Sequence, residues 1–232
     1  MKSLPDKQTI PVNGQIVEYI SSGSGHPGIV LLNGAGGPLS AWTRLYPEIE
    51  SLGSVLAYNR AGIGKSTRAC VPQTGEAIIT TLRGLLVEVG FPAPYIVAGH
   101  SMGGLYANLF ARLFPLEVAG VVMIDATHPD DDALISQNEG VSGRIGRKIF
   151  ATLDGIFGNN KYGEVAFIAE TARQIEKAGP FPDVPLVVVT GGKRPPFWIM
   201  SPAAFQIRLK NQRILATLSL NGKQVIAGKS WH

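Results

Sequence analysis

The sequence contains little cysteine and little charge. Cys70 is the only cysteine among 232 residues, so a fold stabilised by internal disulfides is excluded. Charged residues make up 16% of the chain, below the roughly 25% that is typical of soluble domains. Hydrophobic residues make up 45%. This composition excludes an intrinsically disordered chain, because disorder requires low hydrophobicity and high net charge.

The sequence also lacks long hydrophobic runs. No apolar segment approaches the roughly 18 residues that a membrane-spanning helix requires, so we predict no membrane span. Residues 1–10 carry charged side chains without the apolar segment of a secretory signal. This favours a cytoplasmic protein.

The formal net charge of +4 is small and does not indicate a nucleic-acid partner. The basic residues are scattered and have no interleaved aromatic residues, so we expect them on solvated faces. They include Arg144, Arg147, Lys148, Lys193, Arg194, Arg208, Lys210 and Arg213.

Short apolar segments rich in β-branched residues alternate with longer helical patterns along the chain. This alternation is typical of an α/β fold with a mostly parallel sheet and helices on both of its faces. We predict eight strands, at residues 9–12, 15–21, 28–33, 54–59, 95–99, 120–124, 185–190 and 223–227. We predict helices at residues 40–51, 75–89, 101–114 and 202–220.

Length and pattern together favour one domain. Chains of roughly 200 to 250 residues fold as single α/β units, so we assign residues 1–232 to one domain. Repeated glycines break the helical pattern between residues 125 and 185. We therefore predict a small helical cap there, inserted after the sixth strand at roughly residues 128–183.

A candidate nucleophile lies between a strand and a helix. Gly99-His100-Ser101-Met102-Gly103 matches the pattern G-x-S-x-G, follows the predicted strand directly and opens a predicted helix. In this context the pattern predicts a sharp turn that exposes the serine hydroxyl above the sheet. Only small residues two positions before and after the serine can pass so close to the neighbouring backbone. Ser101 is therefore the predicted nucleophile.

With this motif in place, the chain resembles the α/β-hydrolase family over nearly its whole length. The resemblance implies an α/β-hydrolase fold, whose mostly parallel sheet has eight strands and is flanked by helices. It also implies a serine hydrolase in which the serine acts with a histidine and a carboxylate. No metal and no organic cofactor are implied.

Residues 33–37, Asn-Gly-Ala-Gly-Gly, stand where family members usually begin with His-Gly and supply a donor for the oxyanion. The resemblance implies that the N–H groups of Ala35 and Met102 form the oxyanion hole, with Gly36 as the alternative to Ala35. It also places Gly34 and Gly36 in the substrate site. Donors that are oriented in advance contribute about 3 to 4 kcal/mol each in the transition state.

Residues 58–66 admit two interpretations. They are similar to the family segment Asp-Arg-x-Gly-x-Gly-x-Ser, with Asn59 in place of Asp, and they also imitate a phosphate-binding loop that ends in Gly64-Lys65-Ser66. We reject the phosphate-binding interpretation, because Asn59 stands where that loop needs its first glycine and no helical pattern follows. The hypothesis of a nucleotide-dependent enzyme would therefore depend on Lys65 alone.

Four histidines are candidates for the general base. The resemblance favours His232, which follows the last predicted strand, where the family carries its catalytic base. His128, shortly after the sixth strand, is a second candidate. We expect His26 and His100 to be structural or surface residues. Family members usually continue into a final helix, and a base at the last residue would be poorly held, which favours a longer natural chain.

The resemblance favours Asp125 as the acid. In much of the family the acid follows the seventh strand, but residues 190–194 contain none. Another branch carries it directly after the sixth strand, where Asp125 stands. The order Ser101, Asp125, His232 then matches the family order of nucleophile, acid and base. We expect residues 130–132, all aspartates, to form a solvated run or to be charges at a helix N-terminus that the helix dipole favours.

The predicted reaction is hydrolysis of a carboxylic ester or a related acyl compound through an acyl-enzyme intermediate, so the expected partner is a small acyl substrate. Phe157 and Trp198 are candidate substrate-binding residues. The sequence is equally consistent with both as residues of the hydrophobic core. The alternatives are lactone, amide or carbon–carbon bond hydrolysis, acyl transfer on the same triad, and a non-catalytic ligand-binding relative. The serine argues against branches that open epoxides through an aspartate. The sequence predicts no oligomeric state.

Overall fold

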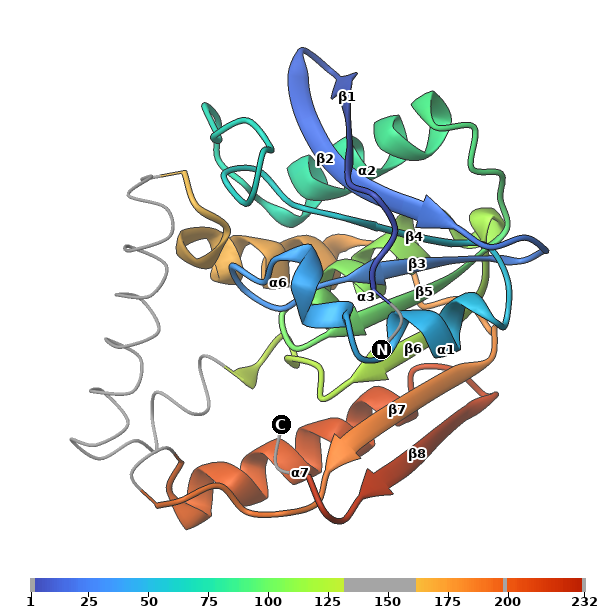
Figure 1. Ribbon diagram of the computed structural model, residues 1–232. Helices are drawn as coiled ribbons and strands as arrows, with labels where there is room; N and C mark the ends of the chain where they lie inside the picture. Colours follow the sequence, from blue (N-terminus) through green and yellow to red (C-terminus); the bar gives the residue numbers. More distant parts are fainter. Residues whose placement is uncertain (1–2, 132–161, 198–199, 231–232) are drawn as a thin grey trace.

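The computed structural model describes residues 3–131, 162–197 and 200–230, which form one eight-stranded sheet flanked by helices (Figure 1). The strand order across the sheet is β1-β2-β4-β3-β5-β6-β7-β8. The strands are β1 (Gln8–Val12), β2 (Gln15–Ser22), β3 (Gly28–Leu32), β4 (Val55–Tyr58), β5 (Tyr95–His100), β6 (Val118–Ile124), β7 (Leu186–Gly191) and β8 (Gly222–Ala227).

The sheet is mostly parallel, as the sequence predicts. β1 and β2 form an antiparallel hairpin, and β2 also pairs antiparallel with β4. The other pairings are parallel. Because parallel strands end at the same edge of a sheet, the segments that follow β3, β5, β6 and β7 lie along one edge. The predicted fold class is confirmed.

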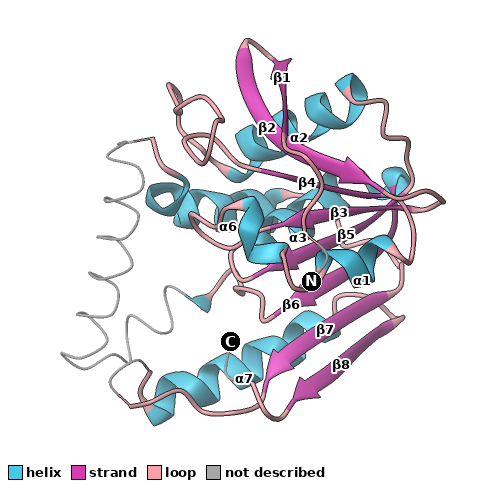
Figure 2. Ribbon diagram, in the orientation of Figure 1, coloured by secondary structure: helices cyan, strands magenta, loops and turns pink. Residues whose placement is uncertain are grey.

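Helices cover both faces of the sheet (Figure 2). One cluster of buried side chains lies between the sheet and α2, α3, α6 and α7, and a second lies beneath η1 and α1. All five residues of β3, which lies between these clusters, are buried. The helices are η1 (Leu39–Trp42), α1 (Tyr46–Glu50), α2 (Gly75–Glu88), α3 (Gly103–Leu113), η2 (Pro115–Glu117), η3 (Glu164–Phe167), α6 (Ile168–Lys177) and α7 (Pro202–Ala216).

The single helix predicted at residues 40–51 is absent. The chain forms the short helices η1 and α1 there instead, and Pro47 lies at the start of α1. Proline has no backbone N–H, and its ring clashes with the preceding turn of a continuous helix. The proline therefore fits the beginning of a helix but not the interior of a longer one.

α7 begins where the sequence predicts and ends earlier. The Ser201 side chain accepts a hydrogen bond from the Ala204 N–H at 3.1 Å and is therefore the N-cap of the helix. The helix ends at Ala216 rather than at residue 220. A Cβ on Gly222 would lie 1.9 Å from the Ala216 carbonyl oxygen, so the chain turns back tightly into β8 there.

Part of the predicted cap lies within the described residues, where α6 docks on α2. The Thr171 side chain accepts from the Gly75 N–H at 2.9 Å, and the Gln174 side chain accepts from the Glu76 N–H at 3.0 Å. Residues 132–161 lie outside the described residues, so the cap at 128–183 and the single domain stay predictions. In the described part of the chain, no helix has the length and apolar character needed to cross a membrane.

Candidate active site

Ser101 lies at the sharp turn between β5 and α3. Its φ is +51°, in the left-handed region that residues other than glycine adopt only when the surrounding structure holds them there. Its N–H donates to the Ile124 carbonyl at 3.0 Å, and its carbonyl accepts from the N–H groups of Gly104 and Thr127, each at 2.9 Å. These bonds hold the strained residue against the end of β6.

Both glycines of the motif are needed where the backbones approach most closely. A Cβ on Gly99 would lie 2.3 Å from the Gly103 carbonyl oxygen, and a Cβ on Gly103 would lie 2.3 Å from the Leu32 carbonyl oxygen. A larger side chain at either position would push the backbone apart. The crowding that the sequence predicts around Ser101 is therefore present.

The loop that follows β3, residues 33–37, lies beside this turn. A Cβ on Gly34 would lie 3.2 Å from the Ser101 Cβ and 3.3 Å from the His100 Nδ1. Within the loop, the Gly37 N–H donates to the Gly34 carbonyl at 3.1 Å. The structure thus brings Ser101 together with the segment that the resemblance assigns to the oxyanion hole.

Three backbone N–H groups in this region are candidate oxyanion donors. The Gly36 N–H donates to Glu164 Oε1 at 2.8 Å and is therefore engaged. For the N–H groups of Ala35 and Met102, the described residues provide no acceptor. Met102 precedes α3, and the first N–H groups of a helix have no partner within that helix. Of the predicted donors, Ala35 and Met102 are the two that the described residues leave open to a substrate oxygen.

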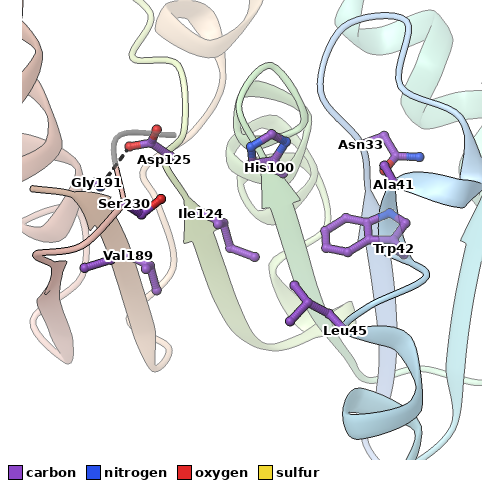
Figure 3. A pocket seen from close by; sticks show the side chains of 11 residues that line it. Asn33, Ala41, Trp42, Leu45, His100, Ile124, Asp125, Val189, Gly191 and Ser230 are labelled. Atoms are coloured by element: carbon purple, nitrogen blue, oxygen red, sulfur yellow. Dashed lines mark hydrogen bonds between the residues drawn. The ribbon is translucent and has the colours of Figure 1, made fainter. Parts of the chain in front are cut away.

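Asp125 follows β6 directly and is fixed on several sides. Its φ is +49°, and its N–H donates to the Val189 carbonyl at 2.7 Å. Its Oδ1 accepts from the Gly191 N–H at 3.1 Å (Figure 3). Its Oδ2 forms an ion pair with Arg208 of α7. Asp125 is 5% exposed and Arg208 is 8% exposed, so the pair is buried.

Two expectations about charged residues are wrong. Arg208, expected on a solvated face, pairs with Asp125 instead. Asp131, expected in a solvated run, is buried, and its carboxylate accepts from the His128 N–H and from Asn211 Nδ2, each at 2.7 Å. Burial raises the pKa of Asp131. α7 supplies both Arg208 and Asn211, so these acids find protein partners in place of water.

His128 is held in a form that does not suit a general base. It is buried, and its Nδ1 accepts from the Asp130 N–H at 3.1 Å. With Nδ1 as an acceptor, the neutral ring carries its proton on Nε2. Burial lowers the pKa of His128, although Asp131 and Asp130 oppose this effect, which favours the neutral ring. A base needs a nitrogen lone pair directed at the serine hydroxyl, and this arrangement leaves His128 none.

A cavity of about 280 Å³ lies beside Asp125 (Figure 3). Its apolar wall includes Trp42 and Val189, and its polar lining includes His100 and Asp125. The sequence did not predict that His100 and Trp42 line a cavity. Across the residues that the structure describes, no group of three or more His, Cys, Asp and Glu side chains is arranged to hold a metal ion.

Three predicted site residues, Phe157, Trp198 and His232, lie outside the described residues. Ser230, two positions before His232, lines the same cavity as Asp125.

Arg60 and Glu164 also contact the loop at residues 33–37, and the sequence did not predict this. Arg60 donates to two carbonyls of the loop, and Glu164 accepts from the Gly36 N–H. A signal for Arg60 was present in the family-like segment at residues 58–66. Glu164 follows a glycine-interrupted stretch that gives no local indication of its partner.

Comparisons with known proteins identify the family of the chain. The sequence model of the alpha/beta hydrolase family matches residues 29–220. The uncharacterized protein YqjL of Bacillus subtilis is 30% identical over 103 residues, which are 44% of this chain and 41% of that protein. The soluble epoxide hydrolase of Corynebacterium sp. is 29% identical over 136 residues, which are 53% of this chain and 46% of that protein. The chain matches less than half the length of these curated relatives.

Solved structures share the fold over almost the whole chain. The enol-lactonase from Burkholderia xenovorans has a TM-score of 0.66 at 21% identity, covering 97% of this chain and 92% of that chain. A probable hydrolytic enzyme from Pseudomonas aeruginosa has a TM-score of 0.67 at 18% identity, covering 98% of this chain and 88% of that chain. Likeness at this level of identity shows the fold alone. Since the family model spans most of the sheet and its crossover helices, the chain belongs to the alpha/beta hydrolase family.

Proposed function

We propose that the chain is a serine hydrolase that cleaves a carboxylic ester or a related acyl substrate through a covalent acyl-enzyme intermediate. The observation that carries this proposal is the position of Ser101 on a strained turn beside the loop that contains Ala35. Acyl transfer needs an accessible nucleophile and, close to it, donors for the oxygen that becomes negative. The N–H groups of Ala35 and Met102 suit the second requirement, because the described residues provide no acceptor for them.

In the first half of the proposed reaction, His232 takes the proton of the Ser101 hydroxyl while Oγ attacks the acyl carbon. The charge that develops on the acyl oxygen is stabilised by Ala35 and Met102, by about 3 to 4 kcal/mol for each donor. His232 then gives the proton to the leaving oxygen, the bond to the alcohol breaks, and the acyl group remains on Ser101.

In the second half, a water molecule takes the place of the alcohol. His232 accepts a proton from the water as its oxygen attacks the acyl carbon, and then returns the proton to Ser101 as the acid leaves. Asp125 is proposed to accept from the Nδ1–H of His232 and to stabilise the imidazolium. The buried position of Asp125 and its bond from Gly191 support this role, since they hold the carboxylate in one orientation.

The nucleophile favours ester hydrolysis over the opening of an epoxide. Branches of the family that open epoxides use an aspartate at this position, and this chain has Ser101. Hydrolysis of a lactone, an amide or a carbon–carbon bond uses the same groups, because the fold does not determine the substrate. Phe157 and Trp198 are proposed as the residues that select the acyl group.

The proposal is tested with p-nitrophenyl esters of increasing acyl length. The wild type should hydrolyse some of them, and Ser101→Ala should lower kcat by about 10⁴-fold or more, because the nucleophile is lost. Ser51→Ala, at an exposed serine after α1, is the matched control and should retain full activity. Turnover by Ser101→Ala at the wild-type rate would refute the role of the serine. Thermal stabilisation by ligands with no turnover of any ester, lactone or amide would favour the non-catalytic alternative.

A further inference from the structure

Arg60 and Glu164 form a buried ion pair between two distant segments of the chain. Their side chains are 4% and 8% exposed. The Glu164 carboxylate accepts from Arg60 Nε and, at 2.8 Å, from Arg60 Nη2. The Tyr106 hydroxyl donates to Glu164 at 3.3 Å, and the Tyr106 ring lies 5.2 Å from the centre of the guanidinium. A buried pair of charges needs such additional bonds to offset the loss of water.

The pair reaches three peptide groups of the loop beside Ser101. Arg60 Nη1 donates to the Asn33 carbonyl at 2.9 Å, and Nη2 donates to the Gly34 carbonyl at 2.5 Å. Glu164 Oε1 accepts from the Gly36 N–H at 2.8 Å. Two carbonyls and one N–H of the loop are therefore oriented by this one pair.

These contacts, together with the geometry of the peptide bond, determine which backbone N–H of the loop is available as an oxyanion donor. In a trans peptide, the C=O and N–H groups point in opposite directions, and no peptide within the loop is cis. Because the Gly34 carbonyl points at Arg60, the Ala35 N–H of the same peptide points away from Arg60. The next N–H, that of Gly36, is turned to Glu164. The Ala35 N–H therefore remains available to a substrate oxygen, whereas the Gly36 N–H is occupied by Glu164.

We propose that Arg60 and Glu164 are positioning residues, which orient the Ala35 N–H as an oxyanion donor and remove Gly36 from that role. This inference rests on the proposed function, because it assumes that an oxyanion forms at Ser101. Neither residue touches the reacting atoms in this account. Their charges act on the backbone of residues 33–36, and the backbone acts on the oxyanion.

The guanidinium remains charged for this role. Burial opposes the charged form, but the charge and hydrogen bonds of Glu164, together with Tyr106 and Tyr58, raise the pKa of Arg60 above its ordinary value. The arginine fork holds two carbonyls and a carboxylate at once, and a lysine has no planar fork with which to do so. Arg60→Lys therefore keeps the charge and removes the geometry.

The test compares two inhibitors of the same chain length, a trifluoromethyl ketone and a methyl ketone. The trifluoromethyl ketone adds to a reactive serine and forms an oxyanion, whereas the methyl ketone binds without forming one to a comparable extent. For each variant we measure both Kd values, kcat and KM, and the fraction of active sites is titrated with a fluorophosphonate. The ratio of the Kd of the methyl ketone to the Kd of the trifluoromethyl ketone cancels the binding of the shared chain and reports on the addition to Ser101, which includes the stabilisation of the oxyanion.

We expect Arg60→Lys to reduce this ratio and kcat by about 100-fold, with little change in KM, because one donor is misdirected. Glu164→Gln keeps the shape of the side chain and should give a smaller loss, of about 10-fold. Arg83→Lys, in the half-exposed pair between Arg83 and Glu117, is the matched control and should leave the ratio unchanged.

Tyr106→Phe keeps the test decisive if the charge variants do not fold, because it removes only the hydroxyl that donates to Glu164. We expect it to reduce the ratio by about 3-fold. If folded variants of Arg60, Glu164 and Tyr106 keep the wild-type ratio and kcat per titrated site, the pair is merely structural and the inference is overturned. A wild type that does not react with the fluorophosphonate at Ser101 would refute the proposed function instead.

Discussion

The site contains two buried ion pairs, Arg60 with Glu164 and Arg208 with Asp125. In both pairs the cation is an arginine, but the two arginines act on different groups. Arg60 lies between Glu164 and the carbonyls of the loop after β3, so its charge acts on backbone groups. Arg208 lies against Asp125, so its charge acts on the proposed acid of the triad. One pair orients donors for an oxyanion. The other holds an anion in place and also reduces the negative charge that it can offer to a histidine.

The surroundings of the two pairs, here called the loop side (around Arg60 and Glu164) and the acid side (around Arg208 and Asp125), also differ in the groups that titrate. On the loop side, the Glu164 charge raises the pKa of Arg60 and burial raises the pKa of Tyr106, so both groups keep their ordinary ionisation near neutral pH. On the acid side, burial lowers the pKa of His128 and raises that of Asp131. We therefore expect pH to affect the acid side more than the loop side.

Among the changes at the two ion pairs, the largest effect is expected from Asp125→Asn. The variant loses the group that orients and stabilises the imidazolium, so kcat should fall by about 10³-fold to 10⁴-fold. It also removes the carboxylate charge from the buried ion pair with Arg208, so the free energy of unfolding should fall, by at most about 3 to 5 kcal/mol. Ester kinetics and urea denaturation measure the two quantities.

The matched control for this variant is Asp183→Asn, at an exposed aspartate that accepts hydrogen bonds from Ser219 and Asn221. It should change kcat by less than about 2-fold, because a surface acid contributes little. Retention of full activity by Asp125→Asn would remove Asp125 from the triad and leave the acid-side pair a purely structural feature.

An intermediate effect is expected from Arg208→Lys, and it sharpens the contrast with Arg60→Lys. A lysine can keep a positive charge beside Asp125, and the Gly191 N–H still holds Oδ1, so kcat should fall by only about 5-fold. The same replacement at Arg60 should cost about 100-fold, because a donor is misdirected. Equal losses in steady-state kinetics at the two positions would show that the pairs do not differ in function.

The smallest effect is expected from His128→Gln and concerns stability against pH. The pKa of His128 is lower in the folded chain than its ordinary value of 6.5, so below pH 6.5 the unfolded chain binds the proton more readily and stability is lost as pH falls. Asp131 has the opposite effect on the pH dependence of stability. Its raised pKa favours the folded chain as pH falls toward the ordinary value of 3.8.

The measurement is the Tm of both proteins at about pH 7.5 and about pH 5.5. The glutamine cannot take up a proton. When the pH is lowered between these two conditions, the Tm of His128→Gln should therefore fall by about 2 °C less than the Tm of the wild type. An identical loss in both proteins would show that His128 does not contribute to the acid sensitivity.

The turn at Ser101 could be predicted because its signal is local. Five residues carry the motif, and an apolar strand and a helical pattern flank it. The pair of Arg60 and Glu164 gave no such signal, because its members are 104 positions apart in the chain. Long-range pairs of this kind are formed by the topology of the sheet, which brings the ends of β3 and β4 beside η3.

Arg208 could have been placed correctly from its helical spacing. The buried positions of α7 include Ala204, Arg208, Asn211 and Leu215, which follow one another at intervals of three or four residues and therefore share a face. The prediction of a solvated face rests on the scattered distribution of the basic residues and does not use this spacing. A charged residue on an otherwise buried helical face is better interpreted as a member of a buried pair.

The central claim is that Ser101 is a nucleophile held by a strained turn, and reaction with a fluorophosphonate tests it most directly. The account predicts one adduct per wild-type chain by intact mass spectrometry, located on the peptide that contains residue 101, and none in Ser101→Ala. An unmodified wild-type protein, or an adduct that persists in Ser101→Ala, would contradict the account.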